Sequence, residues 1–236
     1  MLRRVIWRAL AKSAALFFAV IPRGRRFRVA LRLAEVVAVI AGAWLQRRGM
    51  RGAWATGPYD EALRFVMRVL ADGNVRFDPE LVIDSTAALE RRAIYVSAHF
   101  PISAFFLRHA HDRGVHPVVV KAFPEIDAFV WGTGEPFHAV PRSQAVLVRL
   151  RRHIEEGHPA LVLIDTEQGE TVPFESPYGN TTVATNIFEF AGRLGIPTFF
   201  LAVRLGRVPV IVIRPMAPDP AEFMALLKEQ AALIRR

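Results

Sequence analysis

One histidine stands where an apolar run meets a second apolar run. Residues 93–96 (Ala-Ile-Tyr-Val) read as a buried strand, and His99 comes directly before a segment expected to be helical. A ring at the start of a helix feels the positive end of the helix dipole, which favours neutral imidazole. Because a general base must be neutral, His99 is the first candidate for catalysis. The structural alternative is a core histidine that is hydrogen-bonded to backbone.

Predicted strands and helices alternate through the rest of the chain. Apolar runs mark the strands, and the helices end at glycine or begin at Asp-Pro. The predicted strands are 93–98, 116–123, 159–165 and a hairpin over 197–215, and the predicted helices are 59–70, 102–113, 143–156, 184–194 and 220–235. Residues 166–182 are expected to form a long polar loop. The alternation predicts an α/β fold with a mixed, mostly parallel sheet flanked by helices.

Two further ionisable residues share the position of His99. Lys121 and Asp165 also fall at or near the carboxyl end of a predicted strand. Ligands of such sheets bind beyond the carboxyl ends of the strands. The three side chains are therefore expected at one edge of the sheet.

Several other chemistries are not favoured by the sequence. The chain has no cysteine, which excludes disulfides, thiolate nucleophiles and cysteine zinc sites. His109 and His111 are two residues apart on a predicted helix and face different ways, so no metal site is expected. Ser97 lacks the Gly-x-Ser-x-Gly turn of a serine hydrolase.

The basic charge is confined to the first quarter of the chain. Residues 1–58 contain 12 Lys and Arg but one acid, Glu35, for a net +11, whereas residues 59–236 carry −2. The arginines alternate with apolar runs at 13–22 and 29–46, which favours an anionic membrane surface over nucleic acid. The first run is too short to span a bilayer, and the second contains Arg32 and Glu35, which are costly at the bilayer centre. Helices that lie in the membrane interface are therefore favoured over a true span; the remaining alternative is a buried helical hairpin of the core. We expect residues 1–58 to be a helical, membrane-associated segment and residues 59–236 to be the α/β domain, with a linker near 47–60.

Five phrases follow one another along the chain. They are "VSAHF" (96–100), "FPEIDAF" (123–129), "AVPRSQAVLVRLRRHIEEG" (139–157), "LVLIDTEQG" (161–169) and "VPFESPYGNTTVATNIFEFAGRLGIP" (172–197). In this order they resemble phrases of the bacterial lipid A late acyltransferases, within the lysophospholipid acyltransferase superfamily. Those proteins share a histidine at the end of a strand, an Asn-Pro-x-x-Asp-like segment, an Ile-Pro-Arg phrase before a helix, a strand ending in Asp-Gln, and a Val-Pro-Phe phrase.

The resemblance implies a reaction and a location. His99 would deprotonate a hydroxyl or amine of a lipid or amphipathic acceptor, which attacks an acyl thioester of an acyl carrier protein or coenzyme A. No other cofactor, no metal and no nucleic acid is implied. The protein would lie on the cytoplasmic face of the bacterial inner membrane. The residues implied to bind substrate are Ser103, Lys121, Arg142, Gln168 and Arg204.

The resemblance breaks at the residue that should orient His99. The family has an acid five positions after the histidine, and this chain has Ala104 there. A carboxylate elsewhere can replace it; Asp165 is preferred because a strand anchors it, and the others considered are Glu125, Asp127, Glu167 and Glu170. Alternatively, His99 acts without an orienting acid, or the protein is a catalytically silent relative that binds an acyl or lipid ligand or a partner protein.

Overall fold

The structure is a computed structural model that describes several stretches of the chain. The described residues are 13–22 and 25–40 apart from 15, 27, 31, 35, 38 and 39, then 82–85, 89–98, 104–121, 137–165 apart from 142, 169–176, 179–205 and 209–234. The predicted helix over 59–70 and the predicted linker over 47–60 lie outside these residues.

The described residues form a seven-stranded sheet with the order β1-β9-β8-β2-β5-β3-β4. Its strands are β1 (Val82–Ser85), β2 (Ile94–Ser97), β3 (Val118–Lys121), β4 (Ala139–Pro141), β5 (Ala160–Leu163), β8 (Thr198–Leu205) and β9 (Pro209–Met216). Every neighbouring pair is parallel except β8 and β9, which form the predicted antiparallel hairpin. The prediction of a mixed, mostly parallel sheet is therefore confirmed.

Both faces of the central strands are buried, as expected for a parallel sheet covered by helices. Along β2, Tyr95 belongs to one core cluster, whereas Ile94 and Val96 belong to the cluster on the opposite face. Along β8, Phe199 and Phe200 divide in the same way. Successive strand residues point to opposite faces, so an unbroken apolar run supplies both cores.

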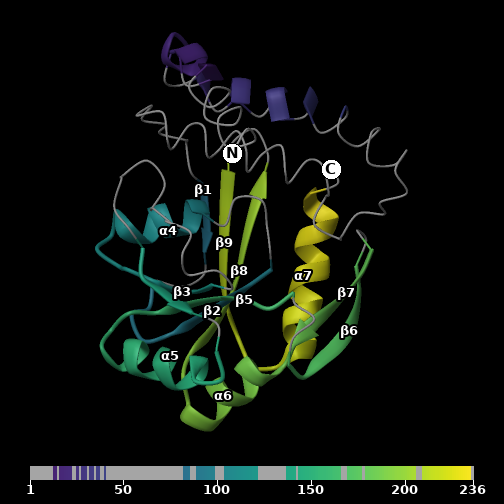
Figure 1. The fold of residues 1–236 in the computed structure, drawn as a ribbon. Coiled ribbons are helices and arrows are strands. Elements are labelled where there is room, and N and C mark those ends of the chain that lie inside the picture. Colours follow the sequence, from purple (N-terminus) through teal and green to yellow (C-terminus); the bar gives the residue numbers. More distant parts are fainter. Residues whose placement is uncertain are drawn as a thin grey trace, which may run out of the picture.

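The described residues after β2 include four helices. They are α4 (Ala104–His111), α5 (Val146–Glu155), α6 (Asn186–Leu194) and α7 (Pro220–Ile234), and their arrangement around the sheet is seen in Figure 1. α4 contributes Phe105 and Phe106 to the core cluster of Tyr95. α6 ends where predicted, because Gly195 adopts a left-handed conformation (φ 62°) that ends the helix without strain.

Helical residues between 13 and 40 pack against the same face of the sheet as α4. Phe18, Ala30 and Ala34 are buried in the core cluster that contains Tyr95. Arg26 joins the two parts of this segment, since its Nε and Nη2 donate hydrogen bonds to the carbonyls of Ile21 (2.7 Å) and Ala19 (3.1 Å). In the described part of the chain, no helix has the length and apolar character needed to cross a membrane. Figure 1 shows these helices in purple, beyond the end of the sheet toward which β8 runs.

The predicted polar loop over 166–182 is wrong for most of its length. Residues Thr171–Ser176 (β6) and Gly179–Ala184 (β7) form an antiparallel hairpin. Phe174 and Val183 are buried among the residues under α6 and α7. Polar residues alternate with these apolar ones, so a hairpin with one buried face was mistaken for a loop. The short strands β1 and β4 were not predicted either.

Candidate functional site

Five neighbouring parallel strands, in the order β8-β2-β5-β3-β4, have their carboxyl ends at one edge of the sheet. Each strand carries or precedes one residue singled out by the sequence: Arg204 near the end of β8, His99 after β2, Asp165 after β5, Lys121 at the end of β3 and Arg142 after β4. His99, Ser103, Arg142 and Gln168 lie outside the described residues, as do the side chains of Lys121 and Arg204. Their roles stay predictions.

The last residue of β2 is fixed to the strands on both sides. Ser97 Oγ donates a hydrogen bond to the carbonyl of Leu201 in β8 (2.8 Å), and the Ser97 carbonyl accepts one from the Ile164 amide (3.0 Å). Ser97 is only 1% exposed. A buried hydroxyl without a hydrogen-bond partner destabilises the folded protein, so this bond holds the strand end in place. The sequence analysis discussed Ser97 only as a possible nucleophile, and it did not predict this positioning role.

Asp165 leaves the sheet from an equally constrained point. Ile164, its predecessor, donates its amide to Ser97 and accepts a hydrogen bond at its carbonyl from the Ala184 amide (2.9 Å). Asp165 itself is half-buried. Two backbone hydrogen bonds one residue away therefore set the direction in which the carboxylate can point.

The loop after Asp165 is closed against the start of α6. The Thr185 amide donates to the carbonyl of Glu170 (2.9 Å), and Thr185 Oγ1 donates to the same oxygen (3.3 Å). Glu170 is exposed. The structure describes two of the carboxylates proposed to replace the missing acid, and of these Asp165 is the half-buried one, directly after β5.

The first turn of α4 contains no acidic residue. Ala104 is the first residue of α4, and it is followed by Phe105, Phe106 and Leu107, which are buried in the core. The position at which the resemblance places an orienting acid therefore begins an apolar helix. The first turn of α4 therefore does not supply the acid that the resemblance implies at this position.

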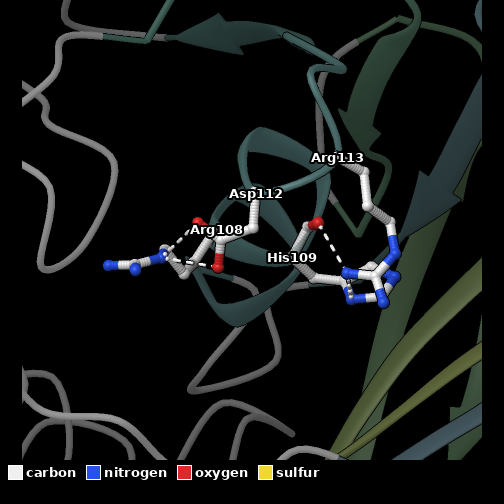
Figure 2. A network of polar contacts seen from close by, with 4 residues as sticks. All are labelled: Arg108, His109, Asp112 and Arg113. Carbon is white, nitrogen blue, oxygen red and sulfur yellow. Dashed lines mark hydrogen bonds and ion pairs between the residues drawn. The ribbon is translucent and has the colours of Figure 1, made fainter.

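A buried histidine does lie on α4, but an arginine holds it in a structural contact (Figure 2). Arg113 Nη1 lies 2.9 Å from Nδ1 of His109, and the Arg108 guanidinium pairs with Asp112 at 2.8 Å. His109 is 4% exposed. Burial and the adjacent Arg113 cation lower the pKa of His109 to about 4. His109 is therefore neutral near pH 7 and engaged within α4, away from the strand ends.

No metal centre is found in the described residues. They contain no group of three or more His, Asp or Glu side chains arranged to hold an ion. His109 and His111 do not form a pair, since His109 contacts Arg113 and His111 contacts the ring of His116.

Exposed apolar side chains are concentrated on the helical residues between 13 and 40. Leu16 is 73% exposed and Val20 is 81% exposed, whereas α5 and α6 each expose a single large apolar residue, Val148 and Leu194. A groove of about 420 Å³ runs along residues 25–36. Its described lining alternates cations with apolar side chains: Arg25, Arg28, Val29, Arg32, Leu33 and Val36. The segment thus offers a mixed basic and apolar surface.

Comparisons with known proteins give a distant structural likeness. No family model matches the sequence, and no curated protein matches it. Among solved structures, the chain is similar to the 1-acyl-sn-glycerophosphate (LPA) acyltransferase PlsC from Thermotoga maritima, with 12% sequence identity and a TM-score of 0.38 over 90% of this chain and 97% of that chain. A likeness this distant does not decide a family or an activity.

Proposed function

We propose that this protein transfers an acyl group from a carrier-protein or coenzyme A thioester to a hydroxyl or amine of a lipid or amphipathic acceptor. The observation that carries the proposal is the shared edge of five parallel strands, at which the residues implied by the sequence resemblance follow the strand ends. Four of the five phrases of that resemblance include or adjoin one of these strands. Without this arrangement, the phrases would be five unrelated likenesses.

The register of β2 and β5 supports a specific pair of residues. Ser97 is paired with Leu163, and the Ile164 amide continues the ladder by one more hydrogen bond. His99 comes two residues after Ser97, and Asp165 comes two residues after Leu163. The two residues therefore leave adjacent parallel strands at equal distances from a paired position, so Asp165 is the carboxylate we assign to orient His99.

The reaction needs two proton transfers, to His99 and then away from it, and one exchange at the acyl carbon. His99 takes the proton from the acceptor hydroxyl or amine, and the freed electron pair attacks the thioester carbonyl. Collapse of the tetrahedral intermediate breaks the carbon–sulfur bond, and the proton on His99 passes to the departing thiolate. Asp165 keeps the imidazole oriented and stabilises its charged form during the step.

We also propose that the segment between residues 13 and 40 attaches the protein to an anionic membrane. Apolar side chains such as Leu16 and Val20 would enter the interface, while Arg25 and Arg28 would face lipid phosphates. This segment lies beyond the end of the sheet that carries the candidate site (Figure 1), so a lipid acceptor would reach the site directly from the bilayer.

The test is acceptor-dependent release of thiol from acyl-coenzyme A and acyl carrier protein thioesters, with a panel of amphipathic alcohols and amines. His99→Ala should reduce turnover by about 10²-fold or more, because a positioned base contributes on the order of 10²–10⁴. His153→Gln, a change at a half-buried position on α5, is the matched control and should keep activity. Full turnover by His99→Ala would remove His99 from the mechanism.

The absence of an acid from the first turn of α4 favours one second candidate function. In that reading the protein binds an acyl or lipid ligand without transferring it. Acyl thioesters would then raise the thermal unfolding midpoint of the wild-type protein, and no acceptor would release thiol.

A further inference from the structure

Histidines gather at the edge of the sheet opposite the candidate site. His116, His138 and His158 each lie one or two residues before β3, β4 and β5, and parallel strands bring these amino ends together. The end of α4 adds His111. These four residues, hereafter the histidine cluster, come from four separate segments of the chain. The sequence analysis considered only one part of it, the "HAHDRGVH" stretch.

The rings of the histidine cluster form two contacting pairs. Ring centroids are 5.3 Å apart for His111 and His116 and 5.4 Å apart for His138 and His158. His153 lies 6.4 Å from His158 on the same measure. A cavity of about 10 Å³, roughly the space of one water molecule, separates His111, His116 and His138 from the apolar side chains behind them.

The charges around the cluster oppose further positive charge at its centre. The pKa of His116 is lowered by partial burial and by its neighbours His111, His138, His158 and Arg91. The described groups that face the cluster from the elements packed around it are Arg91 before β2, His111 on α4, His138 before β4, His158 before β5, and His153 with Glu156 at the end of α5. Glu156 is the one carboxylate among these described groups, and it is already paired with Arg152.

We propose that the histidine cluster is an acid-sensitive contact that holds β4 on the sheet at neutral pH and releases it when the rings are protonated. Neutral imidazoles pack against one another, whereas imidazolium rings at these separations repel. β4 is the strand most easily displaced by this repulsion, since it has three residues and lies at the edge of the sheet. Its backbone contact at this end is the Val119 amide, which donates to the His138 carbonyl at 2.9 Å.

The proposal goes beyond the proposed function and does not depend on it for its test. One consequence does rest on that function: Arg142, a candidate substrate-binding residue, directly follows Pro141 at the other end of β4. Because β4 is so short, its release at the histidine cluster would also displace the position of Arg142, and acyl transfer would fall on acidification.

The experiment follows hydrogen exchange of two neighbouring amides in the full-length protein. The Val119 amide reports the β3–β4 contact, and the Val118 amide, which donates to Pro159 at 2.8 Å, reports the neighbouring contact between β3 and the segment entering β5. Protection is compared at about pH 7.5 and about pH 5.5, one unit either side of the ordinary histidine pKa, after correction for intrinsic exchange. We expect Val119 to lose protection at the lower pH and Val118 to keep more of it.

Two variants separate the histidine cluster from general acid unfolding. His116→Gln removes the ring on which the other three act, and it should preserve Val119 protection at the lower pH. His153→Gln is the matched control and should behave like wild type, because His153 is not among the neighbours that act on His116 and its ring lies 6.4 Å from that of His158. Should His116→Gln disturb the fold at neutral pH, His138→Gln replaces it.

Three results would overturn the proposal. The first is unchanged Val119 protection in the wild-type protein at the lower pH. The second is an equal loss of protection in His116→Gln and wild type. The third is simultaneous loss at Val118, Val119 and the core amide of Val96, since that pattern is global unfolding. None of these readouts requires acyltransferase activity.

Discussion

Arg113 Nη1 lies 2.9 Å from Nδ1 of His109, and this contact decides which imidazole nitrogen carries the proton. A guanidinium nitrogen only donates, so Nδ1 must accept and the proton of the neutral ring is on Nε2. A protonated His109 would turn a donor toward a donor and place two cations side by side. The interaction therefore exists only with the neutral ring.

The first prediction is an acid-dependent loss of stability caused by His109. Its pKa is about 4 in the folded protein and about 6.5 in the unfolded chain. Between these two pH values the unfolded chain binds a proton at His109 that the folded protein does not bind. The free energy of unfolding therefore falls by roughly 3 kcal/mol in total as the pH drops from about 6.5 to about 4. In His109→Gln, urea unfolding across this range should show a correspondingly smaller loss.

Arg113→Gln is the control for the cause of that shift. It removes the neighbouring cation but leaves His109 buried, so the His109 pKa should rise toward its ordinary value without reaching it. Titration of the imidazole by NMR measures this directly. An unchanged pKa would mean that burial alone is responsible.

The second prediction concerns the acid that replaces the one missing at Ala104. Asp165→Asn should lower turnover by about 10²-fold or more, since loss of an orienting carboxylate leaves the base in the wrong tautomer or rotamer. The acidic limb of the pH–rate profile should also move to lower pH, because a carboxylate favours the imidazolium form. A structural role for Asp165 would change stability without moving that limb.

Ala104→Glu is the complementary variant. It restores an acid at the first residue of α4, where the resemblance expects one, and it should raise turnover with a hydroxyl acceptor, most visibly in the Asp165→Asn background. Absence of activity in the wild-type protein, in Asp165→Asn and in Ala104→Glu would favour the non-catalytic, ligand-binding function.

The third prediction concerns the strand end before His99. Ser97→Ala removes the hydrogen bond to the Leu201 carbonyl and should destabilise the protein by about 1 kcal/mol, the usual net value of such a bond. Turnover should fall by more than this loss of stability explains, because the mutation loosens the support of the base. Ser143→Ala, at an exposed position before α5, is the control for both measurements.

The fourth prediction concerns membrane attachment. Leu16→Ser with Val20→Ser should weaken binding to phosphatidylglycerol vesicles by about tenfold or more, since one inserted apolar side chain contributes on the order of 1.5 kcal/mol. Val148→Ser removes a side chain that is 71% exposed on α5, and binding should not change. If Val148→Ser weakened vesicle binding as much as the Leu16→Ser, Val20→Ser double variant, the segment between residues 13 and 40 would not be the attachment surface.

The elements of the fold were largely predictable from neighbouring residues. The apolar runs of β2 and β8, the closing glycine of α6 and the Asp-Pro before α7 are local signals, because hydrogen bonding and burial within an element depend on residues a few positions apart. The same reasoning failed for β6 and β7. Their single buried face leaves only weak alternation, which is hard to distinguish from a polar loop.

The sequence by itself determined the type and order of most elements, though not of β1, β4, β6 and β7, and it determined the chemical groups that follow the strands. Only the tertiary structure decided which strands are neighbours, and hence that Asp165 and His99 follow adjacent strands and that His116, His138 and His158 meet at the opposite edge. The physical reason is that strand order depends on contacts between residues far apart in the chain. Periodicity within a strand shows that it is buried, but it does not show which strand lies beside it.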